Sequence, residues 1–157
     1  MRRKEKQINL RSELEKIIKR ANVVRIALTD NLMPYIVPLN FGYSNNTLYF
    51  HSAKEGRKMD IIKKNNNVAF EIDIDNELIK NEIACKFTMN YRSVIGNGKA
   101  IILTEKKDII NGLNVIMNHY TDVKNFEYND KVLDKIYVVK IEINEMTGKQ
   151  SGYKEFI

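Results

Sequence analysis

Cysteine is nearly absent from this 157-residue sequence: Cys85 is the only one, so the chain cannot form an internal disulfide bond. The chain also has only two histidines, His51 and His119. These three residues do not make up the ligand set of a structural zinc site or of a three-histidine metal centre, and we expect no bound metal. Because Cys85 lies in a strand-like stretch, we expect it to be a small residue of the core.

Long apolar runs are absent as well. No stretch approaches the ~20 apolar residues that a membrane-spanning helix needs. The basic residues within positions 1–6 are not followed by the apolar segment of a secretory signal, so we expect a cytoplasmic protein. With 43% apolar and 29% charged residues, the sequence is typical of one soluble globular domain. We expect this domain to span residues 1–157, with residues 1–10 as a flexible basic arm.

The charge is not concentrated in one place. The net charge is +6, from 26 Lys and Arg residues against 20 Asp and Glu residues, and no dense basic block with interleaved aromatic residues occurs. A basic barrel that binds nucleic acid is therefore the weaker hypothesis, because a small anionic ligand needs far fewer cations. Glu71, Asp73 and Asp75 alternate along one predicted strand, and we interpret them as its solvated face rather than as a metal site.

Proline is scarce, and both prolines, Pro34 and Pro38, lie in the strand-like stretch 33–43. Because proline donates no backbone hydrogen bond, we expect this strand at the edge of a sheet or with a bulge near Pro38. Its free backbone groups then have two interpretations. They belong to an ordinary edge strand, or they pair with a planar heterocycle that has its own donors and acceptors.

Hydrophobic periodicity predicts the remaining elements. Helices are predicted over 12–21, 57–65 and 105–119. The first of them would begin with a capping box formed by Ser12 and Glu15. Strands are predicted over 23–29, 33–43, 47–52, 67–75, 85–104 and 136–145. We expect irregular structure over 76–84, 121–134 and the basic tail 147–151.

Gly96, Asn97 and Gly98 interrupt the longest predicted strand and indicate a bulge or a sharp bend, which is how a sheet curls into a barrel. The strands follow one another with hairpin links, and no internal repeat occurs. The sequence therefore predicts a mainly β fold, a six-stranded antiparallel small barrel with peripheral helices.

One basic turn carries the strongest functional signal. The strand that ends at Ser52 passes through Gly56 into the helix predicted at 57–65, and Lys54, Arg57 and Lys58 gather where that helix begins. Cations are unfavourable at the positive end of a helix macrodipole, by roughly 0.3–1 kcal/mol each at an exposed site. They are favourable if an anion such as phosphate binds among them. The alternative is a solvated basic turn in a lysine-rich chain.

Several motifs, taken in order, resemble those of the FMN-binding split-barrel proteins related to pyridoxamine 5'-phosphate oxidase. Within that family they are most similar to the nitroimidazole-resistance (Nim-type) subgroup. The motifs are VPLNFGY at 37–43, LYFHSA at 48–53, GRK at 56–58, YRSV at 91–94 with GKA at 98–100, and TGK at 147–149. The resemblance extends over about residues 12–150.

The resemblance implies a homodimer with FMN at the subunit interface. The stretch 37–41 would contact the flavin ring through backbone groups, and the basic turn would hold the phosphate, together with residues around Arg92. His51 is the candidate catalytic residue, with a hydrogen-bonded strand histidine as the alternative. The implied cofactor-binding residues are Val37, Pro38, Leu39, Asn40, Phe41, His51, Ser52, Ala53, Arg57, Lys58, Arg92, Ser93 and Val94.

The function that follows from the resemblance is that of an FMN-dependent oxidoreductase. We expect reduced nicotinamide nucleotide, NAD(P)H, as the electron donor and a small nitro or quinone-like compound as the acceptor. A non-catalytic protein that binds or stores flavin is the alternative, because the sequence shows no clear acid–base pair. The Arg-Leu-x-Pro end of true pyridoxamine-phosphate oxidases is missing, so oxidation of vitamin B6 is not expected.

Overall fold

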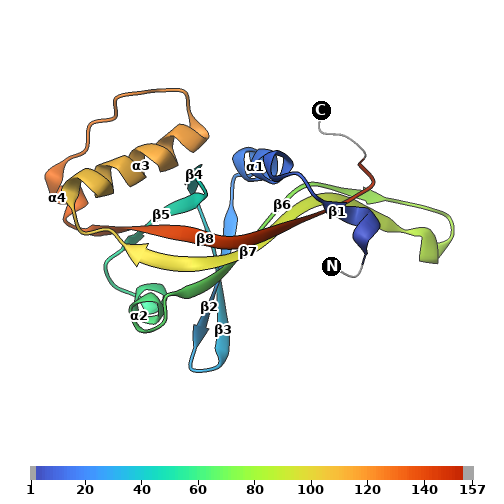
Figure 1. Ribbon diagram of the computed structural model, residues 1–157, viewed down its shortest axis with the longest axis horizontal. Helices are drawn as coiled ribbons and strands as arrows, with labels where there is room; N and C mark the ends of the chain where they lie inside the picture. Colours follow the sequence, from blue (N-terminus) through green and yellow to red (C-terminus); the bar gives the residue numbers. More distant parts are fainter. Residues whose placement is uncertain (1–2, 154–157) are drawn as a thin grey trace.

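The computed structural model describes residues 3–153 of the chain. One antiparallel sheet runs through it, with the strand order β3-β2-β6-β7-β8-β5-β4, and β1 pairs with the far part of β8 (Figure 1). The strands are β1 (Gln7–Ile8), β2 (Val24–Asp30), β3 (Met33–Leu39), β4 (Gly42–Ser44), β5 (Thr47–Ala53), β6 (Asn67–Ile79), β7 (Thr88–Ile102) and β8 (Ile136–Ser151). The predicted mainly β antiparallel fold is confirmed, and the six predicted strands correspond to the six longest of these.

The helices lie at the periphery, as predicted. They are α1 (Arg11–Arg20), α2 (Arg57–Lys64), α3 (Lys106–Tyr120) and the single turn α4 (Asp130–Leu133), with two short 3₁₀ turns, η1 (Lys4–Lys6) and η2 (Ala84–Lys86). In Figure 1, α3 and α4 cover the sheet from one side, whereas α2 and the β2–β3 hairpin lie on the other. No helix of the part described, residues 3–153, has the length and apolar character required to span a membrane.

The core forms because alternate residues of the strands point to the inside of the curved sheet. Phe50, Phe70, Ile72, Val94 and Ile141 are almost completely buried there. Apolar side chains of α1 and α2 join this cluster from the two helices. A second, smaller cluster lies on the outer face of β8, where Val138 packs with residues of α3 and α4. This outer cluster fixes α3 and α4 against the sheet.

The structure shows what becomes of the two strands that the sequence marks as irregular, one by its prolines and the other by its glycines. β3, which contains Pro34 and Pro38, is the edge strand of the sheet, and its register with β2 runs without a bulge from Met33 to Leu39. The bulge expected near Gly98 is present: Asn97 pairs with Glu145, whereas Gly98 pairs with Ile143, so β8 contains one extra residue there.

The N-terminal predictions need correction. Helix α1 begins at Arg11, with Leu10 as its N-cap, so Ser12 lies inside the first turn and forms no capping box. Glu15 instead accepts hydrogen bonds from Arg11 Nε at 3.2 Å and Tyr43 Oη at 3.0 Å. The expected flexible arm contains β1, whose Ile8 is buried, because two residues suffice to pair with β8 but are too few to show a periodic pattern.

The long β6–β7 hairpin also differs from the prediction. Both strands continue past the core, so residues 76–79 belong to β6 rather than to a loop, and the 147–151 tail is the end of β8. Cys85 lies in η2 at the tip of this hairpin and is exposed, so its assignment to the core is wrong. The extension of β6 was missed because residues 76–79 show no alternation of buried and exposed positions.

Candidate functional site

The basic turn lies where the sequence places it, between the end of β5 and the start of α2. Gly56 is the N-cap of α2 and has a φ of 118°, a conformation that favours glycine. Its carbonyl oxygen accepts hydrogen bonds from the backbone N–H groups of Met59 at 2.9 Å and Asp60 at 3.2 Å. Met59 is completely buried and anchors the helix in the core. The turn therefore presents Arg57 and Lys58 from a fixed backbone.

Aromatic rings support the cations of this region. The Arg57 guanidinium carbon lies 4.6 Å from the centre of the Tyr35 ring, and Lys58 Nζ lies 5.4 Å from that of Phe50. On the neighbouring strand β8, the Tyr137 ring has Lys54 Nζ at 5.5 Å and a second lysine of α2, Lys63, at 5.3 Å. Such contacts hold cations in place while leaving their charge available to an anion.

Arg57 and Lys58 differ in their polar partners. Arg57 Nε donates a hydrogen bond to Asp30 Oδ2, at 3.2 Å, from a side chain that is 53% exposed. Lys58 is partly buried and forms no ion pair with a carboxylate in the part described, residues 3–153. Burial lowers the pKa of Lys58, because desolvation disfavours its charged form. An anion beside Lys58 would offset this cost.

The strand β5 directs the adjacent candidates to opposite sides of the sheet. Phe50 points into the core and Ser52 shares its face, partly buried, whereas His51 and Ala53 are exposed on the outer face. Ser52 is therefore on the side of Phe50 and Lys58. His51 lies opposite Val138 of β8, and within residues 3–153 its side chain forms no hydrogen bond. The alternative of a hydrogen-bonded strand histidine gains no support.

The stretch 37–41 ends the edge strand β3. Val37 and Leu39 pack against the core, whereas Pro38 and Asn40 are exposed. Because β3 pairs with β2 on one side only, alternate residues direct their backbone N–H and C=O groups away from the sheet. Phe41 is completely buried, and its backbone N–H donates to Tyr120 Oη at 2.9 Å.

The remaining candidate residues, Arg92, Ser93 and Val94, lie on β7, far in sequence from the basic turn. Arg92 is buried, donates a hydrogen bond to Asp75 Oδ2 at 2.6 Å, and lies 4.3 Å from the centre of the Tyr153 ring. Ser93 points to the outer face of the sheet, and Val94 is completely buried in the core. Arg92 and Val94 therefore point to one face of β7, whereas Ser93 points to the opposite face.

The distance between the basic turn and the candidate residues Arg92 and Ser93 follows from how their strands pair with β6. Arg92 lies opposite Ile74 of β6. The last residue of β2 that pairs with β6 is Ala27, which lies opposite Ala69. Asp30, the partner of Arg57, lies three residues beyond Ala27. The two positions are thus about eight residues apart along β6, or about 26 Å at ~3.3 Å per residue. One copy of the chain brings Ser52, Arg57 and Lys58 together but not Arg92 and Ser93.

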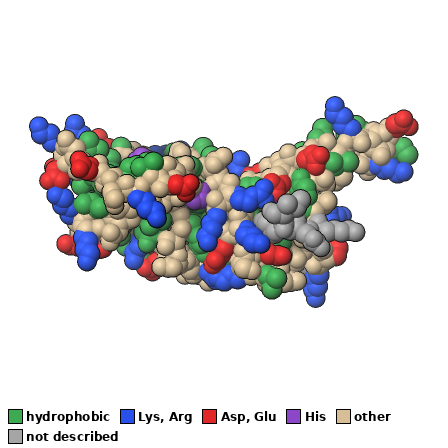
Figure 2. Space-filling view, turned by 90° about the horizontal axis from the view of Figure 1, so that it is seen from above, with side chains coloured by type: hydrophobic (Ala, Val, Ile, Leu, Met, Phe, Trp, Pro, Cys, Tyr) green, Lys and Arg blue, Asp and Glu red, His purple; other side chains and the backbone are tan. Residues whose placement is uncertain are grey.

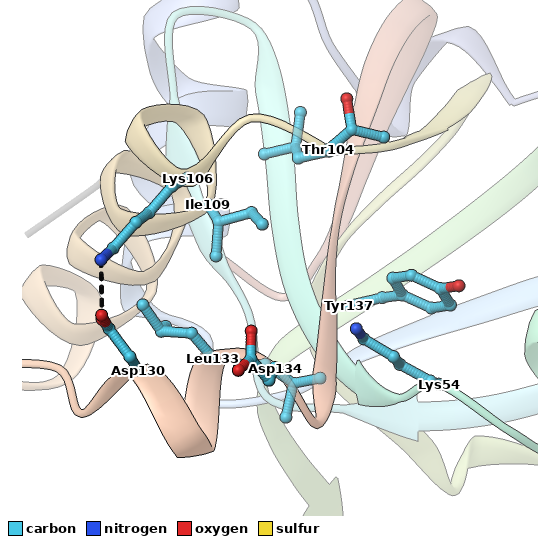
Figure 3. A pocket seen from close by; sticks show the side chains of 10 residues that line it. Lys54, Thr104, Lys106, Ile109, Asp130, Leu133, Asp134 and Tyr137 are labelled. Atoms are coloured by element: carbon cyan, nitrogen blue, oxygen red, sulfur yellow. Dashed lines mark ion pairs between the residues drawn. The ribbon is translucent and has the colours of Figure 1, made fainter.

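A pocket of about 370 Å³ adjoins the basic turn (Figure 3). It lies between the sheet and the helices α3 and α4, and Lys54 and Tyr137 line one side of it. On the other side Lys106 Nζ pairs with Asp130 Oδ1 at 2.7 Å. No sequence motif marks this pocket, because its residues come from three separated segments, at Lys54, 103–109 and 130–137.

Asp30, Tyr35 and Tyr137 are further residues that the sequence analysis missed. Each contacts a cation of the basic turn or of α2 but lies at least 19 positions away from Lys54 in the sequence. Their only local signal is an aromatic or acidic side chain near a strand end. No group of three or more His, Cys, Asp and Glu side chains in the described part, 3–153, is arranged to hold a metal ion.

Comparison with known proteins places this arrangement in a family. The family model described as pyridoxamine 5'-phosphate oxidase matches residues 11–150. The chain belongs to this family. The match includes the basic turn, the edge strand β3 and the β7 candidates, and it confirms the family resemblance found in the sequence. A search of curated proteins gave no match.

Solved structures agree with the pyridoxamine 5'-phosphate oxidase family fold. A proposed 5-nitroimidazole antibiotic resistance protein from Bacteroides thetaiotaomicron is 34% identical, with a TM-score of 0.82, over 91% of this chain and 85% of that one. A flavocytochrome from Azotobacter vinelandii is 16% identical, with a TM-score of 0.85, over 100% of this chain and 74% of that one. An FAD-binding protein from Mycobacterium smegmatis is 22% identical, with a TM-score of 0.63, over 93% of this chain and 99% of that one.

Proposed function

We propose that this chain binds FMN and acts as an oxidoreductase that passes electrons from reduced nicotinamide nucleotide to a small acceptor. The observation that carries the proposal is Lys58, a partly buried cation with a lowered pKa and no carboxylate partner among the described residues 3–153. A phosphate monoester supplies the missing negative charge. Family membership and the flavin-binding proteins among the similar folds support the choice of a flavin.

The residues present fit a flavin phosphate. Lys58 and Arg57 would supply two cations, and Ser52, on the same face of β5 as Phe50, would supply a hydroxyl donor. The outward backbone groups of β3 would pair with polar atoms of the flavin ring. Bound FMN would supply the capacity to accept and release two electrons, and the chain's own residues bind and orient it.

The homodimer is part of the same proposal. Arg92 and Ser93 lie about 26 Å from the Arg57 region along β6, too far to contact one phosphate from the same copy. A second copy with its β7 beside the flavin would use Ser93, which is on the outer face. The outer face of β7 also exposes Ile95 (56%), an apolar side chain suited to an interface. Analytical ultracentrifugation of the purified protein tests this, and a monomer would contradict it.

His51 is the proposed catalytic residue, because it is exposed beside the basic turn on a rigid strand. The likeness, at 34% identity, to a proposed nitroimidazole-resistance protein supports a small nitro compound as the acceptor. His51→Ala should retain FMN and lose turnover of a nitroimidazole with NADH or NADPH. Wild-type protein that keeps FMN but turns over neither nitro nor quinone acceptors would instead be a flavin-binding or storage protein.

The binding test is direct. Purified protein should be yellow and release FMN on heating, and the double variant Arg57→Ala, Lys58→Ala should lose most of the flavin. Lys64→Ala with Lys80→Ala removes the same charge at two exposed positions and should retain it. Full retention by the first variant would refute the phosphate site.

A nucleic-acid-binding barrel is distinguishable from this function. It predicts a colourless protein with binding that weakens steeply as salt increases. Basic side chains are interspersed with acidic ones over the face shown in Figure 2 rather than gathered in one patch, which gives this alternative no support.

A further inference from the structure

The 370 Å³ pocket beside the basic turn has no role in phosphate binding as proposed above, because neither Arg57 nor Lys58 lines it. Lys54 connects the two regions, since it follows β5 directly and also lines the pocket. Pockets that enclose small ligands and cofactors have volumes of about 300–1,000 Å³. A volume of 370 Å³ therefore suits a nucleoside-sized group and is too small for a complete dinucleotide.

The walls of the pocket divide by chemistry. Its apolar side chains come from α3, α4, β8 and the residue that follows β7, and they form one surface on which a flat aromatic group can pack; they are Leu103, Ile109, Leu133 and Ile136. Leu103 and Leu133 belong to the outer core cluster, so this surface is fixed by packing. A purine base needs such rigid apolar walls.

The polar groups match the rest of a nucleotide. Asp130 is engaged by Lys106, whereas the carboxylate of Asp134 forms no ion pair within residues 3–153 and faces the pocket (Figure 3). A carboxylate accepts hydrogen bonds from the hydroxyl groups of a ribose, as in dinucleotide-binding folds. Lys54 lies across from Asp134 and next to the Tyr137 ring, where a 5'-phosphate would meet a cation (Figure 3).

We infer that this pocket binds the adenosine 5'-phosphate part of a dinucleotide, with Asp134 on the ribose, Lys54 on the phosphate and the apolar surface on the purine. Two dinucleotides carry this part: FAD, whose flavin half would lie in the phosphate site, and the reduced nicotinamide nucleotide that donates electrons. The assignment to either cofactor rests on the proposed function. The binding of the adenosine 5'-phosphate part does not.

Calorimetric titration of the full chain with AMP tests the pocket without any flavin. Wild-type protein should bind one AMP per chain, and Asp134→Asn and Lys54→Met should each weaken binding by about tenfold or more, as expected for a lost charge-assisted hydrogen bond. Asp122→Asn and Lys124→Met are matched controls on the exposed loop between α3 and α4, and both should bind AMP as wild type does. Absence of saturable binding to the wild type, or unchanged binding to both pocket variants, would overturn the inference.

A second comparison identifies the cofactor. If FAD occupies the pocket, FAD binds more tightly than FMN, and Asp134→Asn removes the difference. If the nicotinamide nucleotide occupies it, Asp134→Asn raises the KM for NADH or NADPH without changing kcat or FMN content. If Asp134→Asn changes neither the preference for FAD over FMN nor the KM for NADH or NADPH, the cofactor assignment is wrong. A protein that binds AMP but never retains flavin would refute the proposed function and leave the pocket inference standing.

Discussion

Arg57 Nε donates a hydrogen bond to Asp30 Oδ2 at 3.2 Å, and this contact joins the first residue of α2 to the last residue of β2. Asp30 therefore holds the guanidinium over Tyr35 and at the same time competes with any bound anion for it. The pair is half-exposed, and exposed ion pairs contribute about 0–1 kcal/mol to stability.

Asp30→Asn tests this competition. It should change the free energy of unfolding by less than about 1 kcal/mol. It should also tighten FMN binding by about two- to fivefold, because one negative charge near the phosphate is removed. Quenching of flavin fluorescence measures the binding, and urea unfolding measures the stability. Asp122→Asn, far from the turn in sequence and exposed, should alter neither; weaker FMN binding by Asp30→Asn would show that Asp30 positions Arg57 rather than competing for it.

The partial burial of Lys58 predicts that the stability of the folded protein depends on pH. Burial lowers its pKa in the folded protein, so between the folded and the unfolded pKa the unfolded chain binds more protons. The stability of the flavin-free protein, relative to Lys58→Met, should therefore rise as the pH rises through this window and should not change with pH below the folded pKa, where both states bind the proton.

FMN affinity should change in the opposite direction. Above its folded pKa Lys58 loses the charge that attracts phosphate, so the affinity of the wild type should fall as the pH rises, and that of Lys58→Met should fall less. Fluorescence titrations from about pH 7 to about pH 10.5 cover the window. Parallel curves for the two proteins would show that Lys58 does not contact the flavin phosphate.

The fold was predictable from sequence wherever one face of an element is buried. Phe70 and Ile72 on β6, like Val139 and Ile141 on β8, are spaced by two residues and are almost completely buried. This regular spacing is the signal that sequence analysis reads. Where the β6–β7 hairpin leaves the core, as at Cys85, the signal disappears and the prediction failed.

The candidate site was predictable only in its local part. Arg57 and Lys58 are neighbours in the sequence, and a helix start that gathers cations is a pattern within a few residues. Asp30 and Tyr35 reach the same place through the β2–β3 hairpin, and Asp134 reaches the pocket through α4. Such contacts depend on how separate elements pack, which no short motif records.

Gly98 lies next to the β8 bulge, and there is no space for a side chain. A Cβ at this position would overlap the carbonyl oxygen of Glu142 and lie 3.0 Å from Cγ2 of Ile141. Because the obstacle is backbone, Gly98→Ala should lower the free energy of unfolding by about 1–3 kcal/mol. Asn97→Ala, which removes only an exposed hydrogen bond to Glu145, should cost less than about 1 kcal/mol. Urea unfolding at one pH compares them, and equal effects would show that the strand relaxes around the new methyl group.

Tyr120 couples α3 to the stretch proposed to contact the flavin ring. Its hydroxyl accepts the backbone N–H of Phe41 at 2.9 Å and donates to the carbonyl oxygen of Asn22 at 2.8 Å. Tyr120→Phe leaves the N–H of the completely buried Phe41 without this partner and should cost about 1–3 kcal/mol in unfolding free energy.

The same variant should weaken FMN binding, because the backbone at 37–41 loses a contact that fixes its position. Tyr128→Phe is the matched control: it removes a hydroxyl that donates to Asn114 of α3, far in sequence from that stretch, and should leave FMN affinity unchanged. Parallel unfolding and flavin titrations separate the two effects. If Tyr120→Phe destabilises the chain yet binds FMN as tightly as the wild type, the flavin ring does not depend on the position of Phe41, and its contacts lie further along β3.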